Sequence, residues 1–306
     1  MKHIFVVNPC AGKCDSGDKI AAGIDSAGVD AEIYCTTGPY DATRFVGEWI
    51  RAHVGEPVRF YACGGDGTLN EVVSGVVDGG TTDCVEVGCY PCGSGNDFVR
   101  NWNQGAPERY HDIASLCSAP SVAVDVLRVA TADAIRYSIN TLNFGFEAAV
   151  CRSMDSVRRY PLLGGKMAYI TGIEYSLLRQ RRHRCKVTVE GNPWFDGELM
   201  LLSMANGQWA GGGFHCAPHA DPSDGLIEVM SVKTISIPRF ARLIKYYKNG
   251  QIIEREELRA VVDYTRARRV TIEAGSHAVI AADGQVFYGD RFDIECLPNT
   301  LKFIVP

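Results

Sequence analysis

The feature that most constrains the fold is a pair of glycine-rich loops, each placed directly after a short apolar run. The first loop spans 64–67 and follows a run at 58–63, and the second spans 93–97 and follows a run at 85–90. Segments with the apolar spacing of a helix lie between such runs. Strand–helix units joined by short glycine-containing turns are typical of a parallel sheet covered by helices. Residues 1–125 are therefore predicted to form an α/β domain.

The pattern changes near residue 121, where segments that alternate apolar and polar residues become frequent. Seven of them are rich in β-branched residues, namely 122–129, 136–143, 185–189, 198–204, 226–232, 269–273 and 277–281. Such alternation is typical of antiparallel strands with one buried face. Residues 126–296 are therefore predicted to form an all-β sandwich domain, with an open barrel as the alternative. Helices are expected at 165–180 and 238–249, and the tail at 297–306 is expected to return to the first domain as a strand.

Charge and hydropathy exclude several classes of protein. The chain carries 31 Lys and Arg against 36 Asp and Glu, a formal net charge of -5, so nucleic-acid binding through bulk positive charge is not expected. No run approaches the ~18 apolar residues that span a bilayer. The apolar run at 4–7 is too short for the core of a signal peptide. We expect a cytoplasmic protein without a transmembrane segment, and the sequence does not indicate its oligomeric state.

Glycine-rich loops at successive strand ends can bind phosphate groups. Backbone N–H groups approach phosphate oxygens closely there, and a helix that begins at the loop adds the positive end of its dipole. A plain tight turn is the alternative for any single loop. Neither Gly12-Lys13 nor Gly165-Lys166 continues into the P-loop pattern, and G-x-G-x-x-G does not open the first helix. The loops therefore predict a phosphate site of another kind.

Residues 64–71, Gly-Gly-Asp-Gly-Thr-Leu-Asn-Glu, resemble the signature of the diacylglycerol kinase catalytic-domain family, in its soluble bacterial lipid kinase group. NAD kinases and phosphofructokinases share the core of this motif, but five further motifs follow the family's order. These are Asn8-Pro9 with Gly12, Thr36 before Asp41-Ala42, 91–100, 140–146 and 211–229. The resemblance covers most of the chain, includes the sphingosine kinase-like relatives, and implies a Rossmann-like first domain, as in NAD kinases, and a β-sandwich second domain.

The resemblance implies a lipid kinase that transfers the γ-phosphate of ATP to the hydroxyl group of a lipid such as diacylglycerol. Two alternatives stay open: a non-lipid small-molecule kinase such as an NAD kinase, and a nucleotide-binding regulator with weak or no catalysis. The residues that match the family's nucleotide contacts are Asn8, Pro9, Gly12, Thr36, Gly65, Asp66, Gly67, Thr68, Leu69, Asn70, Glu71, Ser94 and Asn96.

The resemblance also implies Mg²⁺, a hard cation that prefers oxygen ligands. The matching groups are the carbonyls of Asp221 and Leu226 and the carboxylate of Asp224 for a structural ion. Asp66, Asp97 and Asp125 match a network joined through water to a catalytic ion. Phosphoryl transfer depends mainly on positioning and charge neutralisation, which carboxylates and backbone N–H groups can supply.

One position departs from the family pattern. The family's late motif Asp-Gly-Glu reads Asp283-Gly284-Gln285 here, and a neutral amide cannot accept the proton of the lipid hydroxyl. Either Asp66 or Asp283 acts as the base, or a base is dispensable, since a base contributes ~10²–10⁴-fold to a rate. Asp283, Asp66 and Gln285 are therefore the candidate catalytic residues.

A lipid substrate would be met at a membrane surface, where basic residues attract anionic headgroups. Two basic runs, within 179–184 and 266–269, are candidates for this contact, and two solvated charged stretches are the alternative. A peripheral location at the inner face of the membrane is therefore open beside the cytoplasmic one.

Overall fold

A computed structural model of the chain describes residues 1–12, 16–80, 83–102, 107–157 and 182–306. Its first half alternates strands and helices, in the order β1 (Lys2–Val7), α1 (Ser16–Ala27), β2 (Ala31–Cys35), α2 (Asp41–Ala52), β3 (Val58–Gly64), α3 (Asp66–Gly79) and β4 (Val85–Pro91). The four strands are parallel and lie in the order β2-β1-β3-β4. Short helices η1 (Phe98–Asn101), η3 (Pro107–His111) and α4 (Ile113–Ser118) follow.

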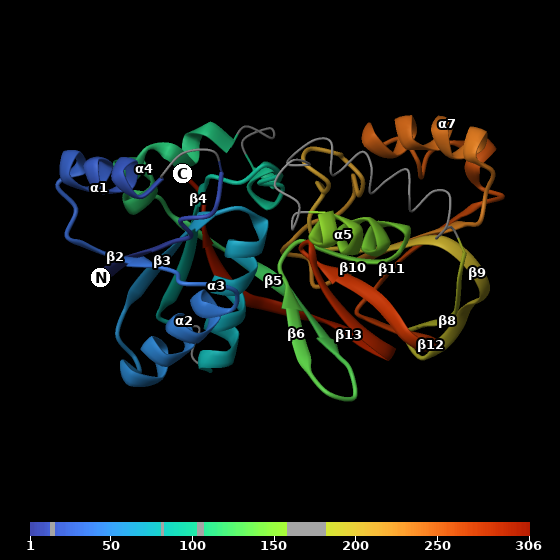
Figure 1. Cartoon of the computed structure of the whole chain (residues 1–306), viewed down its shortest axis with the longest axis horizontal. Coiled ribbons are helices and arrows are strands. Elements are labelled where there is room, and N and C mark those ends of the chain that lie inside the picture. Colours follow the sequence, from blue (N-terminus) through green and yellow to red (C-terminus); the bar gives the residue numbers. More distant parts are fainter. Residues whose placement is uncertain (13–15, 81–82, 103–106, 158–181) are drawn as a thin grey trace.

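Helices cover both faces of this parallel sheet, with α1 and α4 on one side and α2 and α3 on the other (Figure 1). The central strands are therefore continuous apolar runs, and residues 4–7 and 60–63 are buried. The predicted apolar stripe of α2 faces inward through Val46, Trp49 and Ile50. The α/β prediction for the first half is confirmed.

The second half is mostly antiparallel. Its elements are β5 (Ser121–Ala130), β6 (Ile135–Ser138), β7 (Thr141–Gly145), α5 (Phe146–Val157), β8 (His183–Val189), β9 (Asn192–Ala205), β10 (Ile227–Lys233), α7 (Ile237–Lys248), η5 (Glu256–Leu258), β11 (Val262–Ala267), β12 (Arg269–Ala282) and β13 (Gln285–Ile304). The strand order β11-β10-β9-β7-β12-β13 joins them into one sheet. The prediction of a β-rich second half of the sandwich class is confirmed.

Several element boundaries differ from the sequence predictions. The expected strand at 136–143 is two strands, β6 and β7, because the chain turns at Ile139 and Asn140. The expected strands at 269–273 and 277–281 are one strand, β12, with an irregularity between Glu273 and Ala278. The helix expected at 165–180 lies outside the described residues. Within the described part of the chain, no helix has the length and apolar character needed to cross a bilayer.

Strand β13 connects the two halves. It is 20 residues long and pairs antiparallel with β12 and then with β5. Near its end it pairs parallel with β4, through Lys302 beside Glu86 and Phe303 beside Val87. Phe292 is buried in the core of the second half, and Phe303 in that of the first. One strand thus fixes how the loops of the first half meet those of the second.

Candidate active site

Three loops meet at the carboxyl ends of β1, β3 and β4. Gly12 has φ +80°, and a Cβ atom there would lie 2.5 Å from the carbonyl oxygen of Cys92. A Cβ atom on Gly93 would lie 2.4 Å from the Cα atom of Gly65. The N–H of Cys92 also donates to the carbonyl of Gly64, at 2.8 Å. The glycines are needed because these loops are in backbone contact, and they bring predicted nucleotide residues together.

The predicted residues of the first loop are tied to the start of α3. Asn8 donates from Nδ2 to Oγ1 of Thr68 at 3.1 Å, and its Oδ1 accepts from the N–H of Cys10. Pro9 is exposed beside it, and Thr36 lies at the end of β2 with its N–H donating to Val7. All of these residues lie at the same edge of the parallel sheet, where ligands of open α/β sheets bind.

Helix α3 begins at Asp66, and Gly65 before it has no side chain that could cap the helix. The positive end of the helix dipole is therefore not neutralised by a cap, as in many phosphate sites. Leu69, in contrast, is buried in the core. Leu69 therefore holds the helix on the sheet, while Gly67 stays partly exposed in its first turn.

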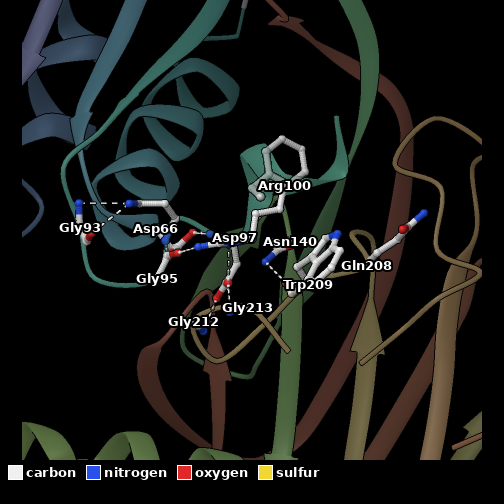
Figure 2. Close-up of polar contacts among 12 residues, drawn as sticks. Asp66, Gly93, Gly95, Asp97, Arg100, Asn140, Gln208, Trp209, Gly212 and Gly213 are labelled. Carbon is white, nitrogen blue, oxygen red and sulfur yellow. Dashed lines mark hydrogen bonds and ion pairs between the residues drawn. The ribbon is translucent and has the colours of Figure 1, made fainter. Parts of the chain in front are cut away.

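Two carboxylates link the loops of both halves, as Figure 2 shows. Asp66 accepts hydrogen bonds from the backbone N–H groups of Asn96 and Asp97, at 2.8 and 2.7 Å. Asp97 in turn accepts from the N–H groups of Gly212 and Gly213, at 2.8 and 2.7 Å. The chain of contacts runs from α3 through the second glycine loop to a loop between β9 and β10.

Burial disfavours the negative charge of both carboxyl groups. Burial, and then the charge of Asp66, raises the pKa of Asp97 to about 6, while Arg100, with Nε 3.5 Å from Oδ1, opposes the shift. Burial also raises the pKa of Asp66, and backbone N–H groups oppose it. Adjacent carboxylates of this kind are stabilised by a divalent cation. Each of the four oxygens of Asp66 and Asp97 already accepts a backbone N–H group, so binding of Mg²⁺ at this pair stays a prediction.

Asp283 has a different environment, although it was predicted beside Asp66 as a candidate base. It lies at the turn before β13 with φ +46°. Its oxygens accept five hydrogen bonds, from Ser138 Oγ, Asn70 Nδ2 and the N–H groups of 139, 140 and 141. Burial raises its pKa, and these donors oppose the shift. With its lone pairs engaged by the protein, Asp283 has the geometry of a positioning residue.

Asn70 is part of the same linkage. Its Nδ2 atom donates both to Asp283 Oδ2 at 2.9 Å and to the carbonyl oxygen of Tyr137 at 2.8 Å. Asn70 is buried, and these bonds join α3 to β6 and to the β12–β13 turn. Its amide hydrogens are therefore occupied in joining the two halves, although the residue was predicted as a nucleotide contact.

Gln285 lies directly over the first turn of α3. Its Nε2 atom is 3.4 Å from the carbonyl oxygen of Gly67. The side chain of Gln285 is half-buried. The structure thus brings Gln285 next to the predicted nucleotide loop, although the two segments are far apart in the sequence.

The remaining predicted nucleotide residues mainly shape the loops. Asn96 closes a turn on Gly93, with Oδ1 accepting from its N–H at 3.0 Å and Nδ2 donating to its carbonyl at 2.9 Å. Ser94 is exposed at the tip of the same loop. Burial raises the pKa of Glu71, and the backbone N–H groups of Tyr40 and Ala42 oppose the shift. Glu71 therefore holds the start of α2 beside α3.

Asp125 belongs with the turn at 221–226 and not with the Asp66–Asp97 pair. It is buried, and its oxygens accept from the N–H groups of Gly225 and Asn299, both at 2.7 Å. Its own N–H donates to the carbonyl of Pro222. The six residues predicted to bind metal therefore fall into two groups, Asp66 with Asp97, and Asp125 with the turn.

The turn itself has its charges matched by protein groups. Asp224 accepts from the N–H of Leu226 through Oδ1 and forms an ion pair with Arg266 through Oδ2. Asp221 accepts from the N–H and Oγ of Ser223. Among the described residues, no three His, Cys, Asp or Glu side chains are grouped as metal ligands. The side chains of this turn are therefore not arranged as the ligands of a cation. A structural Mg²⁺ at the turn stays a prediction.

The sequence analysis did not assign the residues that receive Asp97 from the second half. They are Gly212 and Gly213, and Asn140 lies close by, donating from Nδ2 to the carbonyl of Trp209 at 2.8 Å (Figure 2). Arg100, from the first half, also contacts Asp97. The three consecutive glycines at 211–213 could have predicted the contact of their loop with Asp97 from the sequence. Their backbone N–H groups are open to an acceptor because no side chain shields them.

Known proteins match the chain over nearly its whole length. Residues 2–129 match the diacylglycerol kinase catalytic domain, and residues 140–305 match the YegS C-terminal NAD kinase beta sandwich-like domain. A relative from Xanthomonas euvesicatoria pv. vesicatoria, named "Probable lipid kinase YegS-like", is 30% identical over 285 residues, which cover 91% of this chain and 88% of the relative. A relative of the same name from Citrobacter koseri is 27% identical over 282 residues, covering 91% and 87%.

Solved structures share the fold. A crystal structure described as a diacylglycerol kinase from Bacillus anthracis str. Sterne has a TM-score of 0.71 at 20% identity, over 100% of this chain and 97% of that one. An NAD kinase from Archaeoglobus fulgidus in complex with ATP has a TM-score of 0.51 at 12% identity, over 99% and 93%. The fold is therefore that of two-domain kinases. By its sequence matches, the chain belongs to the diacylglycerol kinase family, which confirms the resemblance seen in the motifs.

Proposed function

We propose that this protein is a lipid kinase that transfers the γ-phosphate of ATP to the hydroxyl group of a lipid such as diacylglycerol. The observation that carries the proposal is the Asp66–Asp97 pair, which lies among glycine loops and is hydrogen-bonded to Gly212 and Gly213 of the second half. Family membership supports phosphoryl transfer, and the lipid kinase names of the relatives support a lipid acceptor.

The glycine loops and the start of α3 would hold the ATP phosphates. Gly12, Gly65 and Gly67 lie where backbone N–H groups can approach phosphate oxygens, and Asn8 orders the first loop through Thr68. Bound Mg²⁺ would neutralise charge on the phosphates, and Asp66 and Asp97 are the carboxylates that would hold it, directly or through water. The protein's contribution is then mainly positioning and electrostatic stabilisation.

Proton transfer is assigned to Asp66 in this proposal. Asp283 has five donors around its oxygens and acts by holding α3 against β6 and β7. Gln285 lacks a group that can accept a proton at neutral pH. Asp66 accepts hydrogen bonds from backbone N–H groups, those of Asn96, Asp97, Phe98 and its own residue, and burial raises its pKa, the direction that favours a general base.

The direct test is transfer of labelled γ-phosphate from ATP with Mg²⁺ to a panel of acceptors in mixed micelles. The panel holds diacylglycerol, a long-chain base, a polyprenol and phosphatidylglycerol, with NAD as a soluble control. Label in a lipid supports the proposal and names the acceptor class, and the Asp66→Asn variant should abolish that signal. Label in NAD alone, or wild-type turnover by Asp66→Asn, would contradict the proposal or its site.

A second candidate function, a nucleotide-binding regulator with weak catalysis, rests on Gln285 beside Gly67. Under this reading the protein binds ATP but transfers little phosphate, and Gln285→Glu should raise transfer by ~10²–10⁴-fold, the usual contribution of a general base. Gln285→Ala is the matched control, because it removes the amide without adding a carboxylate. Equal rates for wild type and Gln285→Glu would remove the reason to consider this candidate.

A further inference from the structure

Helix α7 carries four cations and no acidic residue. Its sequence IPRFARLIKYYK places Arg239, Arg242, Lys245 and Lys248 three positions apart. All four are exposed. The whole chain has a formal net charge of -5, so this concentration of positive charge is opposite in sign to the protein as a whole.

The cations occupy the side of α7 that faces away from the protein. Leu243 and Tyr247 are buried in a core that α5 also covers, and the rings of Phe240 and Phe146 lie 5.2 Å apart. Steps of three residues carry the cations around the opposite side of the helix. Figure 1 shows α7 at the outer end of the second half, on the same side of the sheet as α5. The apolar face is thus used for folding, and the basic face is left to solvent.

The basic runs predicted from the sequence as membrane contacts form ion pairs where the structure describes them, and residues 179–181 of the first run lie outside the described residues. Arg266 pairs with Asp224, and Arg269 with Glu295 at 3.1 Å. Arg184 pairs with Asp196 at 2.7 Å. In contrast, none of the ion pairs found among the described residues includes a cation of α7. Other exposed cations, such as Lys19, Arg136 and Lys186, are also outside these ion pairs, but they lie on separate elements, whereas the four cations of α7 lie on one side of a single helix.

Helix α7 is also joined to the candidate active site. The N–H of His215 donates to the carbonyl of Lys248, the last residue of the helix, at 3.0 Å. The same loop supplies the N–H groups of Gly212 and Gly213 to Asp97. A partner bound to α7 would therefore lie close to the segment 212–215, which contributes hydrogen bonds to Asp97.

We infer that the basic face of α7, defined by Arg239, Arg242, Lys245 and Lys248, docks the protein on a membrane surface that carries anionic phospholipids. Charge complementarity identifies the partner, since clustered Lys and Arg on an amphipathic helix bind anionic headgroups. The purpose of docking, delivery of a membrane lipid to the site, rests on the proposed function. Docking itself does not, because it requires neither ATP nor turnover.

Cosedimentation with vesicles, without ATP, tests the docking surface. Wild type should bind vesicles of phosphatidylcholine with phosphatidylglycerol, and not vesicles of phosphatidylcholine alone, and added KCl should release it. The triple variant R239E/R242E/K245E should bind the anionic vesicles about a hundredfold more weakly, at about fivefold per cation. The matched control K19E/R136E/K186E changes the net charge equally at exposed positions on α1, β6 and β8 and should bind like wild type.

Equal weakening of both triple variants would overturn the inference, because the effect would then follow net charge and not α7. Equal binding of wild type to both kinds of vesicle would overturn it as well. Circular dichroism and thermal unfolding show whether each variant is folded. A folded α7 variant that binds wild-type amounts of anionic vesicles contradicts the inference whether or not the protein phosphorylates a lipid, so the two proposals fail separately.

Discussion

At the scale of single residues, Asp97, Asp125 and Asp283 are all buried, yet their oxygens face different groups. Asp125 and Asp283 accept hydrogen bonds from turns that they hold in place. Asp97 lies beside a second carboxylate, Asp66, and between the two halves of the molecule. The motifs predicted these aspartates as catalytic or metal-binding residues. They could not separate structural from chemical roles, because the donors come from residues distant in the sequence.

The linking role of Asp283 predicts a loss of stability when its charge is removed. In Asp283→Asn an NH₂ group would face donors that now bind a carboxylate, so the free energy of unfolding should fall by about 3 kcal/mol. Urea unfolding at neutral pH measures the change. Asp290→Asn is the matched control on the same strand, because Asp290 is exposed, and should change stability by less than about 0.5 kcal/mol. A similar small change in both would contradict the linking role.

Asp97 predicts a pH dependence of stability in the absence of divalent cations. Its pKa in the folded protein, about 6, exceeds the ordinary value of 3.8. The folded state therefore binds this proton more tightly than the unfolded chain, so the carboxyl group lowers the free energy of unfolding as pH rises from 3.8 to about 6. Urea unfolding across this range should show a smaller decline with pH for Asp97→Asn than for wild type. Equal slopes would mean that Asp97 ionises as it does in water.

At the scale of elements, the turn at 221–226 has an arginine where the family resemblance implies a structural cation. Arg266 forms an ion pair with Asp224, so Mg²⁺ should add little to the stability of this turn in wild type. Arg266→Gln leaves Asp224 without this positive charge, and Mg²⁺ should then raise the unfolding temperature of the variant more than that of wild type. Arg182→Gln, which removes an exposed pairing with Glu198 elsewhere, is the control. Equal effects of Mg²⁺ on the unfolding temperatures of wild type and Arg266→Gln would show that Arg266 does not take the place of a cation at this turn.

The sequence predicted elements well where one local pattern decides the structure. The buried strands 58–63 and 85–90 are close to β3 and β4, and the helix after the first glycine loop is α3. The strand β11, the helix α5 and most of the strand β13 were not predicted. Strand β13 has a mixed pattern of exposed and buried residues, because it passes from one core to the other and changes partners from β12 to β5. Such a pattern depends on tertiary neighbours and has no simple period.

At the scale of the whole molecule, the site exists because the two halves are held in one arrangement. Strand β13 crosses between them, Asn70 reaches Asp283, and Asp97 reaches Gly212. The change of pattern near residue 121 and the family resemblance predicted two domains. The contacts that set their relative position could not be predicted, since they are single hydrogen bonds between residues more than a hundred positions apart.

These connections predict that the two halves unfold together. Strand β13 contributes Phe292 to one core and Phe303 to the other, so unfolding of either half removes packing from its neighbour. Trp49 and Trp102 report on the first half and Trp194 and Trp209 on the second. The variants W49F/W102F and W194F/W209F should therefore show, in each case, a fluorescence midpoint in urea that coincides with the circular dichroism midpoint of the same variant.

A core substitution on β13 provides the stronger version of this test. The ring of Phe303 lies 5.0 Å from that of Phe98 and 5.2 Å from that of Trp102, all in the first half. Phe303→Ala should reduce the free energy of unfolding by about 3–5 kcal/mol. If the halves are coupled through β13, the signals of Trp194 and Trp209 shift to lower urea together with those of Trp49 and Trp102. If the signals of Trp194 and Trp209 keep their wild-type urea midpoint, the core of the second half is stable without that of the first. The shared strand would then position the site without making the two halves one cooperative unit.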